Sequence, residues 1–404
     1  MRSTSPAFLV THAGTYRTVR LFMALLAMIT AVQIGWPHLL GQAQSGVDYN
    51  IFVQVGNLAR AGDLATAYDA IAFESYQATQ PGTFPFMPWT YPPQFNFLAA
   101  FLSLFPVGVG YLLFIGLCLT ALLICLHRLA PDYAAQAVML TLPAMLMCIR
   151  AGQNGFLTAT LFALTFIFVL SARPLRAGTA LGLLAYKPHL GLGIGLVALI
   201  RGGARLWGTA LLVVVVALSL ATWAFGAEIW SYFLSAIRES GVFLRAAAYP
   251  MERMVSVYAF LISTGLPASA AMTGQAIMAA VALGLIIFTL LRRWSLRATL
   301  AVSLVAGLTV SPYAYDYDLV ALSPALALIL PTLARHSTRL ERRALIAALI
   351  LATGWGLLSV ILARPLEAAA ITLPSLGAPG LLFALALIIR LLARAEREDK
   401  RVAA

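Results

Sequence analysis

The sequence predicts an all-α integral membrane protein, a single domain over residues 1–404 with about twelve transmembrane helices. Of its 404 residues, 61% are hydrophobic and only 10% are charged, whereas soluble proteins carry about 25% charged residues. Apolar runs recur along the whole chain, and most approach the roughly 20 residues that a helix needs to cross a bilayer. The net charge of +12 is spread in short patches between these runs. It therefore indicates orientation in a bilayer and no nucleic-acid partner.

The apolar runs define the expected membrane spans. The first follows Arg2, Arg17 and Arg20 and lacks a small-residue cleavage site, so we expect an uncleaved first span. Two adjacent runs are short, and we expect broken helices that meet at Lys187 and Pro188. The predicted spans are 19–40, 107–128, 133–149, 156–172, 176–186, 188–201, 206–225, 272–291, 297–312, 318–334, 343–363 and 376–394.

Basic residues predict the orientation of these spans. If both termini are cytoplasmic, 20 of the 27 lysines and arginines fall in cytoplasmic segments, as the positive-inside rule requires. Ten of the 15 acidic residues then lie outside, together with two long loops at 42–94 and 226–271. We therefore expect a multi-pass protein of the inner (plasma) membrane whose chemistry faces the periplasm or exterior.

The first outer loop begins with a lone carboxylate, Asp48, in front of a helical pattern over 49–61. Ile51, Phe52 and Val55 share one face of this expected helix, which Gly62 would end. A short amphipathic helix beside a membrane usually lies in the interface. Asp48 has two readings: a helix N-cap that accepts a backbone N–H, or a general base on the membrane face.

Aromatic residues return the loop to the membrane at Trp89-Thr90-Tyr91-Pro92-Pro93, where the prolines stiffen the chain. This segment is either an aromatic belt at the interface or a wall for a lipid or sugar ring. The three cysteines, Cys118, Cys125 and Cys148, lie inside apolar runs, and their spacing suggests neither a zinc site nor a disulfide framework. We expect no metal and no cofactor.

Several charged residues lie at membrane depth, where charge is costly and therefore suggests function. Arg150 precedes Gly152-Gln153-Asn154, and Lys187 precedes Pro188-His189. Arg150, Lys187 and His189 could together bind a phosphate; the alternative is that the long side chains reach the headgroup layer. In the late outer loop, Asp318 is expected to cap the following span, whereas Asp316 has no such structural role.

These motifs occur in a fixed order along the chain. The sequence carries Asp48 with its helix, Tyr91-Pro92-Pro93, Gly152-Gln153-Asn154, Lys187-Pro188-His189 and Ser311-Pro312. This set resembles glycosyltransferase family 87, the polyprenyl-phosphate-mannose-dependent alpha-mannosyltransferase group with the GT-C membrane fold, over roughly residues 19–335. Each motif is short, so the order of the set carries the resemblance.

The resemblance implies an inverting hexosyltransferase at the outer membrane face. The donor would be a sugar, typically mannose, on a polyprenyl phosphate, and the acceptor a glycolipid, a glycan or a protein of the cell envelope. Asp48 would be the catalytic base, with Arg150, Lys187 and His189 binding the donor phosphate. The implied substrate-binding residues are Tyr49, Tyr91, Gln153, Asn154, Tyr315 and Asp316.

Two other classes of protein also fit a polytopic chain. A secondary transporter or lipid flippase would share the broken helices and the charges at membrane depth, and a non-catalytic scaffold would need neither Asp48 nor Lys187. A transporter places polar groups along a path that opens to both faces. Here the acids and the aromatic turns gather on one predicted face, which favours the enzyme.

Overall fold

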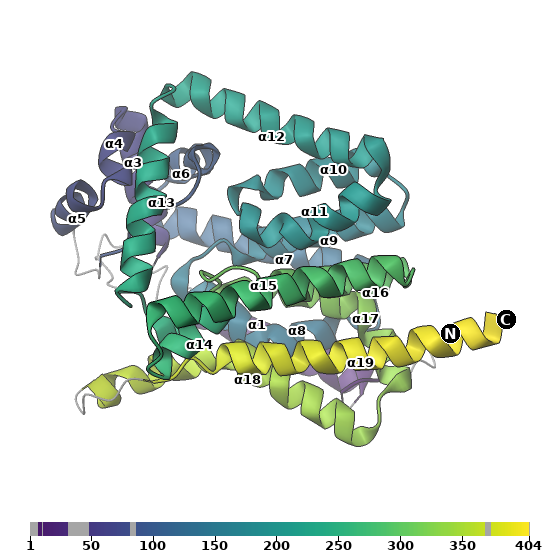
Figure 1. Cartoon of the computed structure of the whole chain (residues 1–404). Coiled ribbons are helices and arrows are strands. Elements are labelled where there is room, and N and C mark those ends of the chain that lie inside the picture. The colour runs from purple at the N-terminus through teal and green to yellow at the C-terminus, as the bar shows by residue number, and fades with distance from the viewer. Residues whose placement is uncertain (1–6, 10, 31–47, 81–85, 368–372, 404) are drawn as a thin grey trace.

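The computed structural model describes residues 7–9, 11–30, 48–80, 86–367 and 373–403 (Figure 1). The end of the predicted span 19–40 and the beginning of the loop 42–94 lie outside this part. The described residues form helices and contain no strand, apart from an isolated antiparallel bridge between Met254 and Tyr315. The all-α prediction is therefore confirmed.

The α-helices follow one another with short connections. They are α1 (His12–Thr30), α3 (Tyr49–Ala61), α4 (Leu64–Tyr68), α5 (Ala70–Ala78), α6 (Asn96–Leu102), α7 (Val107–Leu129), α8 (Ala134–Ala151), α9 (Gly155–Leu170), α10 (Pro174–Leu183), α11 (Pro188–Arg201), α12 (Gly203–Phe225), α13 (Ile229–Arg245), α14 (Val257–Ser263), α15 (Ala268–Leu291), α16 (Leu296–Gly307), α17 (Leu322–His336), α18 (Arg339–Glu367) and α19 (Gly377–Ala403). In the part of the chain that the structure describes, four 3₁₀ turns join them: η2 (Pro93–Phe95), η3 (Leu184–Tyr186), η4 (Met251–Arg253) and η5 (Asp316–Ala321).

Seven helices of the described part are long and apolar enough to cross a membrane. They are Val107–Leu129, Ala134–Ala151, Gly203–Phe225, Ala268–Leu291, Asp316–His336, Arg339–Leu362 and Gly377–Arg401. Three shorter apolar helices accompany them: Gly155–Leu170, Pro188–Arg201 and Leu296–Gly307. The chain is thus a helical membrane protein, and the count of twelve spans stays a prediction.

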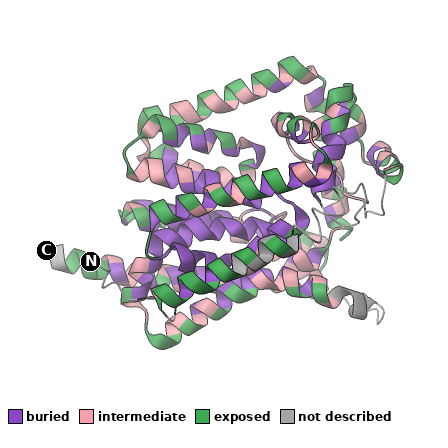
Figure 2. Cartoon of the chain, turned by 180° about the vertical axis from the view of Figure 1, so that it is seen from behind, coloured by how far each residue is buried: buried purple, intermediate pink, exposed green. Residues whose placement is uncertain are grey.

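The long helices lie side by side, while α3, α4, α5 and α13 gather at one end of the bundle (Figure 1). The turn η5 and helix α17 form its buried centre, with every residue of Asp316–Leu330 buried. Figure 2 shows this buried interior and the exposed outer helices. Helix α12 buries only Leu206 and Ala221 and exposes Trp223 by 85%. An apolar helix this exposed is suited to contact with lipid.

The helix predicted over 49–61 is confirmed as α3, which ends where Gly62 adopts a left-handed φ of 76°. Asn50 and Gln54 of its polar face are buried together with the apolar face, and its placement at the membrane interface stays a prediction. Helix α6 lies so close that a Cβ at Gly56 would come within 2.1 Å of the Ala99 carbonyl oxygen. The close packing of α6 thus encloses α3.

Two breaks between helices bring polar residues into the interior. The predicted break at Lys187 is confirmed: η3 ends at Tyr186, and Pro188 begins α11, a position where its missing N–H costs nothing. Helix α8 ends at Ala151 and is capped by Gly152, which has a φ of 72°, and α9 begins at Gly155. A Cβ at Gly152 would lie 2.5 Å from the Cβ of Tyr49. Close packing and the left-handed turn therefore both require glycine here.

Candidate active site

Three carboxylates and two cations meet in the interior. We call Asp48, Lys187, Arg253, Asp316 and Asp318 the charged cluster. Asp316 is 0% exposed, Asp318 2%, Lys187 5% and Asp48 8%. The five residues come from the start of α3, the break before α11, η4 and η5. Buried charges are costly unless they are paired, so the pairing within this cluster decides what it can do.

Lys187 and Asp318 form the first ion pair, with 2.7 Å between Nζ and Oδ1. The ammonium lies 5.1 Å from the ring centroid of Tyr317 and 5.9 Å from that of Tyr91. Asp318 Oδ2 accepts the Tyr315 backbone N–H at 3.2 Å. The prediction that Asp318 is an N-cap is wrong, because it lies inside η5, whose N-cap position is Tyr315. Its main partner comes from a distant helix break.

Arg253 and Asp316 form the second pair, through Nε to Oδ2 at 3.1 Å and Nη2 to Oδ1 at 3.2 Å. Such a two-point contact fixes direction as well as distance. Asp316 Oδ1 also accepts the Tyr317 backbone N–H at 2.8 Å. Asp316 lies against α18 where Gly356 has no side chain; a Cβ there would fall 2.1 Å from Oδ2. Asp316 therefore has a clear structural role.

Arg253 was not among the predicted site residues; it lies in the long loop 226–271 that the sequence places on the outer side. Its role could have been suspected from Asp316, which had no assigned structural role, because a buried carboxylate needs a cation or several hydrogen-bond donors. The loop containing Arg253 is joined to the loop containing Asp316 by the Met254–Tyr315 bridge and by a Val255 N–H donated to the Ala314 carbonyl at 2.8 Å.

Asp48 is the third carboxylate of the cluster, and it does not act as a helix cap: its side chain makes no capping hydrogen bond to α3. It accepts a hydrogen bond from Gln153 Nε2 at 3.1 Å instead. The Tyr91 hydroxyl donates to Gln153 Oε1 at 3.2 Å and accepts from Asn154 Nδ2 at 2.7 Å. We call Asn154, Tyr91 and Gln153 the relay, because Asn154 donates to Tyr91, Tyr91 donates to Gln153 and Gln153 donates to Asp48.

The charge balance of the cluster sets Asp48 apart. Each cation is paired with another aspartate, and among the described residues no ion pair involves Asp48. Burial raises the pKa of its carboxyl, while the nearby Arg253 charge and the Gln153 hydrogen bond oppose this rise. A neutral amide holds a carboxylate in place without neutralising it. Asp48 is therefore oriented and is a better proton acceptor than an ordinary aspartate.

The relay also leaves one acceptor unused. The Oδ1 atom of Asn154 is buried and has no hydrogen-bond partner among the described residues. A buried polar atom without a partner costs free energy.

The other predicted site residues lie at different distances from the cluster. His189 is half-buried and interacts electrostatically with Asp318 and Lys187. Tyr315 stacks on Tyr317, with 5.4 Å between ring centroids. Tyr49 is fully buried, and its ring packs on Phe52, Tyr111 and Phe114. Arg150 is exposed at the end of α8 and takes part in no ion pair of the described chain. The structure does not bring the Arg150 side chain to Lys187.

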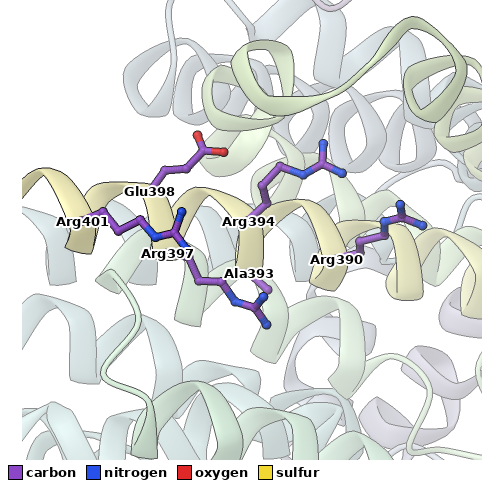
Figure 3. A pocket seen from close by; sticks show the side chains of 6 residues that line it. All are labelled: Arg390, Ala393, Arg394, Arg397, Glu398 and Arg401. Atoms are coloured by element: carbon purple, nitrogen blue, oxygen red, sulfur yellow. The ribbon is translucent and has the colours of Figure 1, made fainter.

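A surface pocket of about 420 Å³ lies far from this cluster, on the C-terminal part of α19 (Figure 3). It is lined by Arg390, Ala393, Arg394, Arg397, Glu398 and Arg401. Arg390 and Arg394 pair with Glu341, and Glu398 pairs with His336 at the end of α17 opposite η5. These pairs fasten α19 to α17 and α18, so the pocket does not compete with the charged cluster as a reaction site. No group of three or more metal-binding side chains occurs in the described residues.

The helices and the buried charges together define a polytopic membrane protein with a polar interior site. The family model for glycosyltransferase family 87 matches residues 89–312, more than half of the chain, and the chain belongs to this family. The resemblance seen in the sequence is thereby confirmed, and the helical architecture is consistent with the GT-C fold. No curated protein and no solved structure matches the chain. The family indicates a glycosyltransferase in a membrane, with a sugar donor and an acceptor.

Proposed function

We propose that this glycosyltransferase moves mannose from a polyprenyl-phosphate donor to a hydroxyl group of an envelope glycolipid, glycan or protein, with inversion at the sugar. It would be a hexosyltransferase of the inner (plasma) membrane whose site faces the periplasm or exterior. Asp48 is the proposed general base. The observation that carries this proposal is the buried Asp48 carboxylate, oriented by a neutral amide and unpaired beside two complete ion pairs.

The proposed reaction needs no metal or nucleotide, because the donor phosphodiester already contains its leaving group. Asp48 takes the proton of the acceptor hydroxyl while the acceptor oxygen bonds to the anomeric carbon. The bond between that carbon and the phosphate oxygen breaks, and polyprenyl phosphate leaves with the electron pair. Attack opposite to the leaving group inverts the configuration. A base of this kind contributes about 10²–10⁴-fold in rate.

Charge grows on the departing phosphate, and nearby cations stabilise it. We assign this role to Lys187 and Arg253, with His189 beside them. Arg253 takes the place that the sequence analysis gave to Arg150, because it is held against Asp316 and interacts electrostatically with Asp48. In the same proposal the free Asn154 Oδ1 and the Tyr91 ring contact the sugar.

Contacts at the two ends of the chain support the proposed orientation. His12 contacts the Asp132 carbonyl at 2.7 Å, and Arg342 donates to the Ala7 carbonyl at 3.2 Å. Near the C-terminus, Lys400 donates to the Arg292 carbonyl and Glu398 pairs with His336. All these partners lie in segments that the basic bias predicts to be cytoplasmic. The charged cluster lies at the other ends of α9, α11 and α17.

A transfer assay on the full chain in nanodiscs tests the proposal. The donor is a polyprenyl-phosphate mannose with a radioactive sugar, and the acceptor is a lipid extract from cells in which the gene is deleted. We expect a labelled product from wild type and at least about a 100-fold lower rate from Asp48→Asn. The product's anomeric configuration, read by NMR, reports inversion.

Asp63→Asn is the matched control, since Asp63 lies in the same loop but caps α4 and is exposed. It should transfer at the wild-type rate. Wild-type turnover by Asp48→Asn would remove the base assignment. Transfer from a nucleotide sugar, but not from the lipid donor, would remove the proposed donor class.

A further inference from the structure

A second cavity, of about 330 Å³, opens at the ends of α9, α11 and α16. Its walls are mainly apolar and include Phe168, Val197 and Leu300, whereas two cations, Arg173 and Arg201, line it as well. We call this cavity the arginine pocket. Apolar walls with a few fixed polar groups, in a volume of at least about 300 Å³, are typical of small-molecule sites.

Arg201 is held in a fixed position at this pocket. Its Nη1 donates to the Trp294 carbonyl at 2.9 Å and to Thr299 Oγ1 at 3.3 Å, and its Nη2 donates to the Leu290 carbonyl at 3.5 Å. All three partners are neutral groups. The carbonyls at the end of α15 offset part of the positive charge through the helix dipole, but they do not neutralise it.

The helices that line the pocket contain no acidic residue. Glu396 of α19 accepts the Ser295 backbone N–H at 2.8 Å beside the pocket, but it forms no ion pair with Arg173 or Arg201 among the described residues. Between Asp132 and Glu228 the sequence contains no acidic residue, and this stretch includes all of α9, α10, α11 and α12. Neither Arg173 nor Arg201 takes part in an ion pair of the described residues. A half-buried cation in apolar surroundings, without an acidic partner, favours the arrival of an anion from outside the chain.

The arginine pocket is separate from the charged cluster. Helix α11 begins at Pro188, next to Lys187, and its 14 residues end at Arg201, which places the pocket about 21 Å along the helix axis from Lys187. The flanking helix α12 is apolar and has only two buried residues, Leu206 and Ala221, so this side of the bundle is suited to lipid.

We propose that the arginine pocket binds one anionic phospholipid. Its phosphate group lies against Arg173 and Arg201, and one acyl chain enters between the apolar side chains of α9 and α16. Charge complementarity selects the headgroup, and the apolar walls select a lipid over a free anion. The site is independent of the reaction site and would stabilise the packing of α9, α11 and α16.

Native mass spectrometry of the full chain tests this proposal. The purified protein is equilibrated with equal amounts of phosphatidylglycerol and phosphatidylcholine in detergent, and the retained lipid is identified. We expect wild type to retain one phosphatidylglycerol. Arg173→Gln should lower this preference by about fivefold, as expected for one cation near a lipid headgroup. Ala198→Leu, which fills the pocket and keeps both arginines, should lose the lipid altogether.

Arg205→Gln is the matched control, because Arg205 is exposed on α12, carries the same charge and does not line the pocket. It should retain the lipid as wild type does. Equal retention of both lipids, or unchanged retention in Arg173→Gln and Ala198→Leu, would overturn the proposal. So would displacement of the lipid by millimolar inorganic phosphate, since the pocket would then be a simple anion site.

Discussion

Lys187 and Asp318 form a buried ion pair, with 2.7 Å between Nζ and Oδ1, although they lie 131 positions apart in the sequence. Asp318 is at the start of the buried segment that leads into α17, and Lys187 is at the break before α11. The pair therefore joins two helices at the level of the proposed reaction. It also means that the lysine proposed to meet a phosphate already has a carboxylate partner in the substrate-free protein.

The first prediction concerns this pair. Lys187→Met leaves the Asp318 carboxylate buried without a cation, which costs about 3–5 kcal/mol. We expect a large fall in the melting temperature of the detergent-solubilised protein. The double variant Lys187→Met/Asp318→Asn should recover most of this stability, because both charges are gone. It should not recover transfer, and a double variant with wild-type transfer would show that Lys187 has a structural role only.

The second prediction is that Asp48→Asn stabilises the fold while it abolishes transfer. Burial raises the pKa of Asp48 in the folded protein, so the folded state binds this proton more tightly than the unfolded state does. The stability that depends on this proton is present at low pH and is lost as pH rises through the folded pKa. At neutral pH the neutral Asn avoids this loss. Melting temperatures between pH 4 and 8 should show a difference between wild type and Asp48→Asn that widens as pH rises.

The third prediction separates orientation from substrate contact at Gln153. Gln153→Leu removes the donor to Asp48 Oδ2. Losing a hydrogen bond to an ionised group costs about 1.5–3 kcal/mol, which is about 1–2 units of pKa. We expect the acidic limb of the pH–rate profile to move to higher pH by that amount, with a lower maximal rate. An unmoved limb with a raised KM would assign Gln153 to substrate binding, as the sequence analysis expected.

The fourth prediction tests the position of Asp316. Gly356→Ala places a Cβ 2.1 Å from Asp316 Oδ2, so the carboxylate and its partner Arg253 must move. Such overpacking costs about 1–3 kcal/mol, and we expect transfer to fall by about tenfold or more. Gly354→Ala is the control on the same helix, because its Cβ would meet only Pro143 at 3.6 Å, an ordinary contact. Equal transfer rates in the two variants would contradict the proposed role of the Arg253–Asp316 pair.

The sequence predicted those parts of the fold that depend on local patterns. The bounds of α3, its end at Gly62 and the break at Lys187 follow from apolar spacing, from a glycine that can adopt a left-handed φ and from a proline that begins a helix. These signals lie within a few residues of the features that they determine.

The partners within the candidate site could not be predicted in the same way. Arg253 and Asp316 are 63 positions apart, and no local pattern connects them. Arg150 was expected to bind the donor phosphate, yet Gln153 and Asn154 after the turn at Gly152 are buried while Arg150 is exposed at the end of α8. Burial of Asn50 and Gln54 depends on the close approach of α6, which helical periodicity does not reveal.

The bridge between Met254 and Tyr315 has a consequence for how this enzyme can change over evolution. One main-chain hydrogen bond, from the Val255 N–H to the Ala314 carbonyl, joins the segment 253–255 to the segment 314–316, and the two segments carry the two halves of the Arg253–Asp316 ion pair. An insertion or deletion within 253–255 or 314–316 would shift the pairing of these two segments. The distance between the Arg253 guanidinium and the Asp316 carboxylate would change with it. Relatives that use different sugars or acceptors are therefore expected to vary in the connections before residue 250. They should keep the chain length within the segments 253–255 and 314–316 unchanged.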